Sequence, residues 1–526
     1  MRILVSDTLD KEGIEILKQA PSIEVDVMTN LTHDELKGVI KDYDGLAIRS
    51  ATKVTADVIE RAEKLKVIGR AGIGLDNVDV IAASKKGIVV MNTPGGNTIT
   101  TAEHTIAMMF ALARKIPQAT ASMKAGKWEK NKFMGSEVYN KTLGIIGIGR
   151  VGSIVADRAL GLKMNVIAYD PFISHEAAEK LGITLVSLDE LLQRSHFISV
   201  HTPMTKETRG MINASAFAKM RDGIFIINCA RGGIVSEKDL YDAVKSGKVA
   251  GAALDVFEEE PTKNTDLISL DRVICTPHLG ASTEEAQKNV AIAIAEQIVD
   301  YLTKGEIRNA VNFPSVTAEI LSQIQPYLAL AEKLGKFEAQ IVAGGIEEVH
   351  VEYSGEILNY NVAPVTISLL KGLLEPILNE NINYINAPLV AKERGIKVIE
   401  SRSSEVKDFT SLISLTVKTR KETSFIAGTI FGRQDPRIVR IGDFSMEVIP
   451  EGHMLVLYNY DRPGVIGNIG TTLGNNNINI ARFQLSREQV DGQALVVLST
   501  DSVVPEEVLQ KLLHLPNVIS VKQLEI

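Results

Sequence analysis

Short apolar runs alternate with segments of helical periodicity over the first 300 residues of the chain. The segments between the runs, such as Ser174–Leu181 and Glu237–Ser246, carry apolar residues at helical spacing. Strands are predicted at Arg2–Ser6, Gly45–Ile48, Val67–Ile68, Val89–Asn92, Leu143–Ile146, Asn165–Tyr169, Phe197–His201, Ile224–Asn228 and Val273–Thr276. Strand–helix alternation of this kind predicts parallel sheets joined by crossover helices. Nine strands are many for one compact domain, so we expect two doubly wound α/β domains.

Two longer helices are expected to connect these domains. Residues Thr100–Glu103 have the form of a capping box, with a hydroxyl for an orphan N–H and a carboxylate three residues on. The helix that begins there is expected to continue to Pro117. A second helix, over Thr283–Lys304, would run back to the first domain.

The pattern changes after about residue 306. Residues Asn309–Pro314 are expected to be a linker, and helices and strands follow them up to about residue 450. From His453 the order becomes strand, helix, two strands, helix and strand, which is the βαββαβ order of a ferredoxin-like unit. We therefore expect four domains: residues 1–98 with 283–306, residues 99–282, residues 307–451 and residues 452–526.

Composition and charge narrow the class of protein. The chain has 526 residues, of which 45% are apolar, and a formal net charge of -8. Nucleic acid and anionic membranes do not attract a net-acidic chain, so we expect neither as the main partner. Cys229 and Cys275 are too few for a disulfide framework, and we expect both to be small buried side chains. The pattern shows neither a secretory leader nor a membrane span, which favours a cytoplasmic protein.

A glycine-rich sequence is the first candidate for chemistry. Gly147, Gly149 and Gly152 follow a predicted strand and precede a helical segment, and Asp170 ends the next strand. Glycines allow a tight turn and a close approach of the backbone to a pyrophosphate, which the N–H groups of the helix would face. Asp170 would bind the adenosine ribose hydroxyls and repel a 2′-phosphate, so the pattern predicts NAD rather than NADP. The alternative is a glycine-rich turn that binds no ligand.

Three further residues follow predicted strands at the edge where α/β sheets bind ligands, with Glu260 just past a strand predicted at Gly251–Phe257. They are Arg231, Glu260 and His278. A carboxylate bonded to a histidine fixes its tautomer and raises its pKa, and an arginine grips a substrate carboxylate. Beside a nicotinamide, this set suits hydride abstraction from a 2-hydroxy acid. His201, which also ends a strand at that edge, is the rival base, and His104 is expected to be a satisfied core residue.

Several stretches together resemble the D-isomer-specific 2-hydroxyacid dehydrogenase family over about residues 1–306. They are GIGRVGS, VHTPMTKETRGMI, NCARGGIV, GAALDVFEEEP and PHLGAST. Three more, IRSATKVTADVI, GRAGIGLDNVD and QATASMKAGKW, resemble the branch that acts on D-3-phosphoglycerate. The resemblance implies two Rossmann-like domains and NAD-dependent oxidation of D-3-phosphoglycerate to 3-phosphohydroxypyruvate, which opens serine biosynthesis. It also implies that Arg231, Glu260 and His278 are the catalytic residues.

Contacts with both ligands follow from the same resemblance. For the cofactor they are expected from Gly147, Gly149, Arg150, Val151, Gly152, Asp170, Thr202, Cys229, Ala230, Arg231, Asp255, His278 and Gly280. For the substrate they are expected from Arg49, Ser50, Arg70, Gly72, Asn97 and Lys132. Lys132 would act from a partner subunit, with a solvated basic surface as the alternative, and no metal is expected.

The residues after the linker resemble two further modules. Residues 310–450 resemble the intervening domain of long-form members, and residues 453–526 resemble an ACT domain, a small-molecule sensor. The resemblance implies feedback inhibition by L-serine bound at Asn459, Asp461 and Asn479, with an ACT domain that only dimerises as the alternative. It also implies a homotetramer, because two domains would each pair about a two-fold axis. A hydroxypyruvate or glyoxylate reductase and a non-enzymatic NAD-sensing scaffold are the rival functions.

Overall fold

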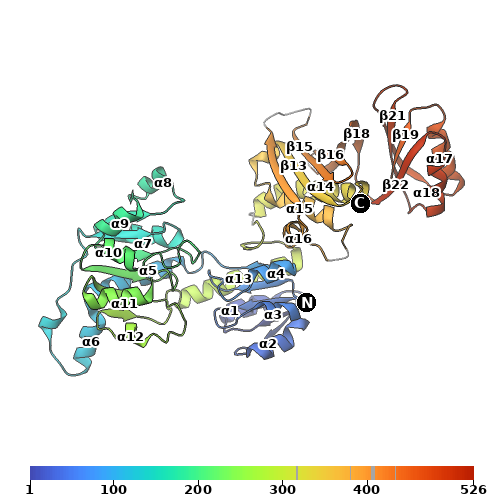
Figure 1. Ribbon diagram of the computed structural model, residues 1–526. Helices are drawn as coiled ribbons and strands as arrows, with labels where there is room; N and C mark the ends of the chain where they lie inside the picture. Colours follow the sequence, from blue (N-terminus) through green and yellow to red (C-terminus); the bar gives the residue numbers. More distant parts are fainter. Residues whose placement is uncertain (315–317, 379–380, 404–408, 433) are drawn as a thin grey trace.

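The computed structural model describes residues 1–314, 318–378, 381–403, 409–432 and 434–526, which form four sheets (Figure 1). The first two sheets are entirely parallel, the third is mixed and the fourth is antiparallel. This arrangement confirms the predicted fold class, with two Rossmann-like domains followed by an α+β unit and a ferredoxin-like unit. The exact domain boundaries stay a prediction. No helix in the described ranges is both long enough and apolar enough to cross a membrane.

The first sheet has the order β2-β1-β3-β4-β5. Its elements are β1 (Arg2–Val5), α1 (Lys11–Gln19), β2 (Glu24–Val27), α2 (His33–Val39), η1 (Ile40–Asp42), β3 (Gly45–Ile48), α3 (Ala56–Arg61), β4 (Val67–Arg70), α4 (Val80–Lys85) and β5 (Val89–Met91). The inner strands are buried and read as continuous apolar runs. Strand β2 escaped prediction because it is a partly exposed edge strand with the sequence EVDV.

Residues 309–313 lie along the edge of β5, so the predicted linker is an ordered strap. Ala310 forms an antiparallel bridge with Met91. The side-chain oxygen of Asn312 accepts from the N–H of Val90 at 3.0 Å. These bonds cover an edge strand that would otherwise expose unpaired backbone groups.

The second sheet has the order β12-β11-β10-β9-β6-β7-β8. Its elements are β6 (Thr142–Ile146), α7 (Arg150–Gly161), β7 (Asn165–Tyr169), α8 (His175–Lys180), β8 (Thr184–Leu185), α9 (Leu188–Arg194), β9 (Phe197–Val200), α10 (Ala214–Lys219), β10 (Ile224–Asn228), α11 (Glu237–Ser246), β11 (Val249–Leu254), α12 (Thr265–Ile268) and β12 (Val273–Cys275). The strand order reverses between β6 and β9, where doubly wound sheets bind ligands. Strand β8 escaped prediction because it has only two residues.

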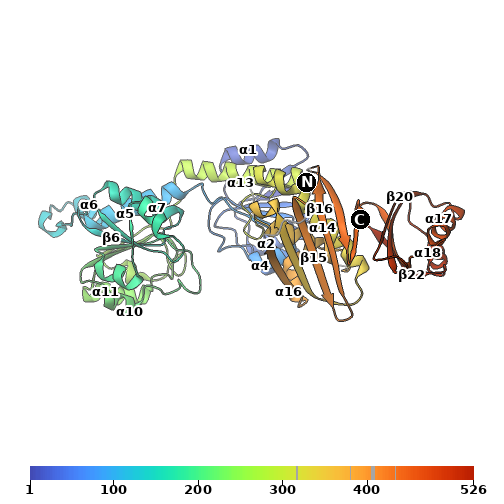
Figure 2. The same cartoon turned by 90° about the horizontal axis from the view of Figure 1, so that it is seen from above.

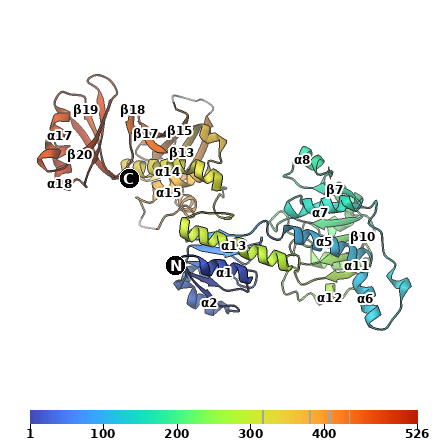
Figure 3. The same ribbon diagram turned by 180° about the vertical axis from the view of Figure 1, so that it is seen from behind.

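Two helices connect the two parallel-sheet units. Helix α13 (Glu284–Lys304) leaves the second unit and packs against α1 and β4 of the first, as expected (Figures 2 and 3). Helix α5 (Thr98–Ala113) precedes the second sheet and packs against α7.

The predicted start and end of the first bridging helix were both wrong. Helix α5 begins at Thr98 with Asn97 as its N-cap, so no capping box forms at residues 100–103. The hydroxyl of Thr101 instead donates to the Asn97 carbonyl at 3.0 Å. The helix ends before Lys115, which is left-handed with a φ of 53°, and α6 (Ile116–Lys124) follows. Pro117 lies in the first turn of α6, where its missing N–H costs nothing.

The remaining sheets have the orders β14-β13-β15-β16-β17-β18 and β20-β21-β19-β22. The intervening unit comprises α14 (Ala318–Ile341), β13 (Ile346–Gly355), η3 (Glu356–Asn359), α15 (Ala363–Leu374), α16 (Ala387–Glu393), β14 (Lys397–Ser403), β15 (Ser411–Thr419), β16 (Thr423–Phe431), β17 (Asp435–Ile441) and β18 (Phe444–Val448). The last unit comprises β19 (His453–Tyr460), α17 (Val465–Asn475), β20 (Ile480–Arg487), β21 (Gln493–Thr500), α18 (Glu506–Leu513) and β22 (Val518–Glu525). The predicted βαββαβ order is confirmed.

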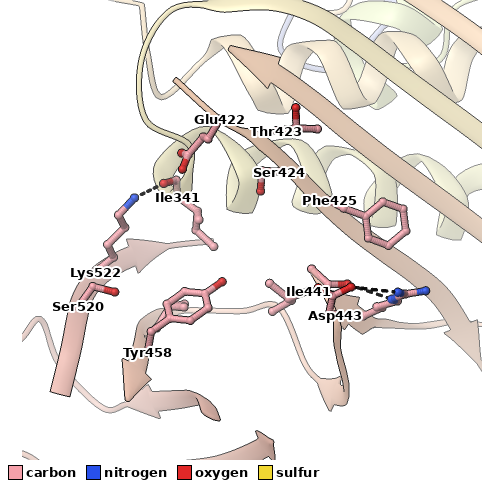
Figure 4. Close-up of a pocket in the computed structure, with 13 residues that line it drawn as sticks. Ile341, Glu422, Thr423, Ser424, Phe425, Ile441, Asp443, Tyr458, Ser520 and Lys522 are labelled. Carbon is pink, nitrogen blue, oxygen red and sulfur yellow. Dashed lines mark hydrogen bonds and ion pairs between the residues drawn. The ribbon is translucent and has the colours of Figure 1, made fainter. Parts of the chain in front are cut away.

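The last two units share a hydrophobic core. Val456 of β19 joins the buried cluster that contains Phe337 of α14. Lys522 donates to the carbonyl of Ile341, beside a cavity of about 620 Å³ lined by both units (Figure 4). Burial raises the pKa of Glu338 to about 7. The last unit and the intervening unit are therefore joined by packed side chains as well as by the chain.

Candidate active site

His278 and Glu260 form a hydrogen-bonded pair at the carboxyl edge of the second sheet. His278 Nδ1 lies 2.7 Å from Glu260 Oε2. The N–H of Phe257 donates to the other oxygen, Oε1, at 3.1 Å. Because Nδ1 is engaged, Nε2 is the ring nitrogen that can exchange a proton with a bound substrate.

The pair shifts the pKa of both members. The hydrogen bond to Glu260 raises the pKa of His278, although burial opposes the shift. Burial raises the pKa of Glu260, but the hydrogen bonds from His278 and the Phe257 N–H outweigh it, so the net pKa is lowered. Glu260 therefore stays ionised near neutral pH and stabilises a protonated imidazole.

Asp255 holds the turn that carries His278. Its carboxylate is fully buried and accepts from the N–H of Leu279 at 2.7 Å and from that of Gly280 at 2.8 Å. The carbonyl of Asp255 accepts from the N–H of His278 at 2.9 Å. Asp255 thus positions His278 and Gly280, while direct contacts of Asp255 and Gly280 with a cofactor stay predictions.

His104 belongs to the same network. Its Nε2 lies 3.3 Å from Asp255 Oδ1 and 3.2 Å from the hydroxyl of Thr276. The ring is satisfied, as the sequence suggested, but its partners support the turn that carries His278. Only the packing of α5 against the second sheet reveals this role, because the spacing of one histidine on a helix does not show what it faces.

Three arginines converge on the space between the first two sheets. Arg49 follows β3, Arg70 ends β4 and Arg231 follows β10. Burial, together with repulsion from Arg231 and Arg49, lowers the pKa of Arg70 to about 10. Such a concentration of positive charge suits an anionic substrate. Sequence reasoning missed Asp7, whose carboxylate accepts from the N–H of Arg49 at 2.6 Å and so anchors that loop.

Two glycines leave room for these guanidinium groups. A Cβ on Gly72 would lie 3.0 Å from Nη1 of Arg70. A Cβ on Gly74 would lie only 2.2 Å from Nη2 of Arg231. Gly74 belongs to the first domain and Arg231 to the second, so these two domains meet at the candidate site.

The glycine-rich loop fits a dinucleotide. Gly147 has a φ of 95°, and a Cβ on Gly152 would lie 2.0 Å from the Gly147 carbonyl oxygen. Around Gly149, by contrast, no described atom lies within 4 Å of an added Cβ. Gly149 is the N-cap of α7 and brings no side chain, so the helix N–H groups face the space where a pyrophosphate would bind.

Four residues that the sequence predicts as cofactor contacts lie on or near the loop, and their contacts with NAD stay predictions. Asp170 follows β7 and accepts from the N–H of Ile148 at 2.7 Å, which holds it beside the loop. Arg150 donates to the carbonyl of Pro94 at 2.7 Å, and Val151 follows it in the first turn of α7. The hydroxyl oxygen of Thr202 is buried without a hydrogen-bond partner in the described residues.

Comparison with known proteins identifies the family. Residues 106–280 match the model of the D-isomer specific 2-hydroxyacid dehydrogenase NAD binding domain. Residues 323–442 match the D-3-phosphoglycerate dehydrogenase intervening domain, and residues 453–517 match the ACT domain. A D-3-phosphoglycerate dehydrogenase of Archaeoglobus fulgidus is 47% identical over 100% of both chains. One of Bacillus subtilis is 41% identical over 100% of this chain and 99% of its own.

The chain belongs to the D-3-phosphoglycerate dehydrogenase family. It is therefore an NAD-dependent oxidoreductase with an intervening domain and an ACT domain, as the sequence resemblance implied. A D-lactate dehydrogenase of Aquifex aeolicus, solved in complex with NAD and lactic acid, is 29% identical with a TM-score of 0.52. The match covers 60% of this chain and 100% of the D-lactate dehydrogenase chain.

The structure gives different environments to His201 and His278, the two histidines that the sequence offers as the base. Burial lowers the pKa of His201 to about 4, and its Nε2 lies 2.8 Å from the hydroxyl of Ser199. A ring that stays neutral and hydrogen-bonded in this way is a poor proton acceptor, so the geometry favours His278 over His201 as the candidate base. Burial raises the pKa of Cys229 to about 12, so this thiol is an inert core group. Cys275 was wrongly expected to be buried, because the short edge strand β12 leaves it exposed.

The other expected substrate residues divide into two groups. Asn97 and Ser50 lie on the first domain, and the side-chain oxygen of Asn97 is buried without a partner in the described part of the chain. Lys132 lies on η2 (Lys130–Phe133) and donates to Glu129 at 2.8 Å. Its segment, cyan in Figure 1, extends beyond α6 on the side away from the first domain. Within the described residues the side chain of Lys132 is hydrogen-bonded to Glu129 and not to the arginine cluster.

The expected effector residues do not form one site in a single chain. The strand pairing places Asn459 opposite Ala494 of β21, whereas Asn479 immediately precedes Ile480, which pairs with Thr500. Six residues of β21 span about 20 Å. Asn459 and Asp461 thus lie at one end of the ACT sheet and Asn479 at the other, a separation that the sequence order could not show.

Proposed function

We propose that this chain oxidises D-3-phosphoglycerate to 3-phosphohydroxypyruvate. The observation that carries the proposal is the convergence of Arg49, Arg70 and Arg231 beside the His278–Glu260 pair. A substrate with a carboxylate at one end and a phosphate at the other needs more than one guanidinium group. The names of the full-length relatives support the same substrate.

Each residue then has one role in the reaction. Arg231 binds the substrate carboxylate through its planar fork, while Arg49 and Arg70 face the phosphate. His278 Nε2 accepts the proton of the C2 hydroxyl as the hydride leaves C2, and Glu260 stabilises the resulting imidazolium. NAD, held by the glycine-rich loop when bound, supplies the hydride acceptor. In the reverse direction His278 returns the proton to the carbonyl oxygen.

The deciding experiment is the reduction of 3-phosphohydroxypyruvate by NADH, with hydroxypyruvate and glyoxylate as rival substrates. The proposal requires the highest kcat/KM for the phosphorylated substrate. A preference for hydroxypyruvate or glyoxylate would make the protein a reductase of the unphosphorylated acids. Negligible turnover of all three, with NADH binding retained, would favour a non-enzymatic NAD sensor.

L-serine is the proposed feedback inhibitor, bound at the ACT domain between two copies of the chain. The side-chain oxygen of Asn459 is buried without a partner in the described residues, which is favourable for a polar ligand. Because Asn479 lies at the other end of the sheet, a site with all three residues needs Asn479 from a second copy. Inhibition by serine should therefore disappear in Asn459→Ala and in Asn479→Ala, each with its uninhibited rate retained.

A homo-oligomer follows from this arrangement, and a tetramer is the proposed state. Lys132 would reach the substrate only from a partner subunit, which also requires a second copy. Two different two-fold interfaces close a tetramer. Light scattering of the full chain tests the state, and a monomer with full, serine-sensitive activity would exclude both shared sites.

A further inference from the structure

Asp76 is a carboxylate of the first domain that contacts the substrate arginine of the second. It lies in the loop after β4, and its Oδ2 is 3.1 Å from Nε of Arg231. The Asp76 side chain is 69% exposed and that of Arg231 is 31% exposed. Ion pairs this exposed stabilise a fold by only about 0–1 kcal/mol. Stability therefore does not account for the contact, and its position between the two domains at the candidate site calls for a functional explanation.

The guanidinium of Arg231 is held from both sides of the cleft. On its own domain, Nη1 donates to the carbonyl of Ala230 at 2.7 Å. On the opposite domain, Nε meets Asp76 and Nη2 lies against Gly74, where a Cβ would be 2.2 Å away. These contacts define the plane of the guanidinium. They engage two of its five N–H donors and leave Nη2 to face a substrate carboxylate.

Charge gives Asp76 a second effect. Burial is the main cause of the lowered pKa of Arg70, and repulsion from the guanidinium groups of Arg231 and Arg49 adds to it. Asp76 acts against this repulsion, because its charge raises the pKa of Arg70. Asp76, in contact with Arg231, thus offsets part of the repulsion between Arg231 and Arg70.

We propose that Asp76 is a positioning residue that orients Arg231 across the cleft and thereby sets the affinity for the substrate carboxylate. It takes no part in hydride or proton transfer. The proposal rests on the proposed function, since it requires that Arg231 bind the carboxylate. Substitution of Asp76 should therefore change the KM for 3-phosphoglycerate and leave the KM for NAD unchanged.

The first test is the steady-state kinetics of Asp76→Ala with 3-phosphoglycerate and NAD. Loss of this exposed ion pair should raise the KM for 3-phosphoglycerate by up to about fivefold, with kcat, the KM for NAD and the pH profile nearly unchanged. Asp76→Asn should show a smaller rise, because its amide oxygen still accepts from Arg231. An unchanged KM for 3-phosphoglycerate would overturn the proposal. A lower KM would also overturn it, because it would show that Asp76 competes with the substrate carboxylate for Arg231.

A double-mutant cycle separates positioning from a local effect on the loop. In an Arg231→Lys background, which lacks Nε, Asp76→Ala should raise the KM little further. A full, additive rise would show that Asp76 acts without Arg231.

Asp79→Asn is the matched control from the same loop, because Asp79 caps α4 by accepting from the N–H of Ala82 at 2.9 Å. It should lower the melting temperature and leave the KM unchanged. A wild-type chain inactive on 3-phosphoglycerate would refute the proposed function itself, an outcome distinct from all of these.

Discussion

A methyl group on Gly74 would lie 2.2 Å from Nη2 of Arg231, although Gly74 belongs to the first parallel sheet unit and Arg231 to the second. Arg231 has a long side chain and can move aside, so Gly74→Ala should fold with an almost unchanged melting temperature. The displaced guanidinium should raise the KM for 3-phosphoglycerate roughly tenfold. Gly149→Ala is the comparison, because its Cβ would enter the expected pyrophosphate space and should raise the KM for NAD instead. If Gly74→Ala and Gly149→Ala changed the KM values for 3-phosphoglycerate and NAD alike, the placement of Gly74 at the substrate and of Gly149 at NAD would be contradicted.

Removing the charge of Glu260 should move the pH dependence of oxidation. The neutral imidazole of His278 takes the proton, so the rate rises with pH through the His278 pKa. Glu260 raises that pKa, and Glu260→Gln should therefore shift the acid limb of kcat/KM to lower pH. His278→Ala is the reference variant and should lose about 10²–10⁴ in kcat. An acid limb that stays in place in Glu260→Gln would show that another group titrates.

Arg49 should distinguish the phosphorylated substrate from its unphosphorylated counterpart. Arg49→Ala removes one cation from the phosphate end and should lower kcat/KM for 3-phosphoglycerate roughly 10–100-fold. The low activity with D-glycerate should change little, because that acid has no phosphate. Lys53→Ala removes an exposed cation from the same loop and should affect neither substrate. A parallel loss with both acids would place Arg49 at the carboxylate.

Asp170 should set the preference for NAD. Its carboxylate lies beside the glycine-rich loop, held by the N–H groups of Ile148 and Phe172. A 2′-phosphate there would meet a like charge, so the wild type should use NAD at least about tenfold better than NADP. Asp170→Ala should bring the kcat/KM values for NAD and NADP closer together. Comparable efficiencies in the wild type would refute the assignment.

Glu338 should make stability fall as pH rises. Burial raises its pKa to about 7 in the folded chain, above the ordinary value of about 4.3. Between these values the folded state holds a proton that the unfolded state releases, so stability decreases with pH across this window. Glu338→Gln should therefore raise the melting temperature at pH 8 more than at pH 5. The exposed Glu347→Gln should show no such difference, and an equal shift of Glu338→Gln at both pH values would contradict the prediction.

Much of the fold could be predicted because buried parallel strands are apolar on both faces. The runs at Gly45–Ile48, Asn165–Tyr169 and Ile224–Asn228 coincide with β3, β7 and β10 residue for residue. Edge strands such as β2 and β8 have only one neighbouring strand, so their sequences lack this signal. The end of α5 was missed for a related reason, since apolar residues continue past the break at Lys115 into α6.

By itself, the sequence determined which residues stand at the ends of the parallel strands. That was enough to place Arg231, Glu260 and His278, and the glycine-rich loop before α7, at the ligand edge, because chain order dictates which edge of a parallel sheet each turn occupies. The tertiary structure alone decided what faces these residues from other elements. The contacts of Asp76 with Arg231, of His104 with Asp255 and of the 309–313 strap with β5 join residues distant in the chain. Such contacts depend on how whole helices and sheets pack, and no local pattern of side chains encodes that packing.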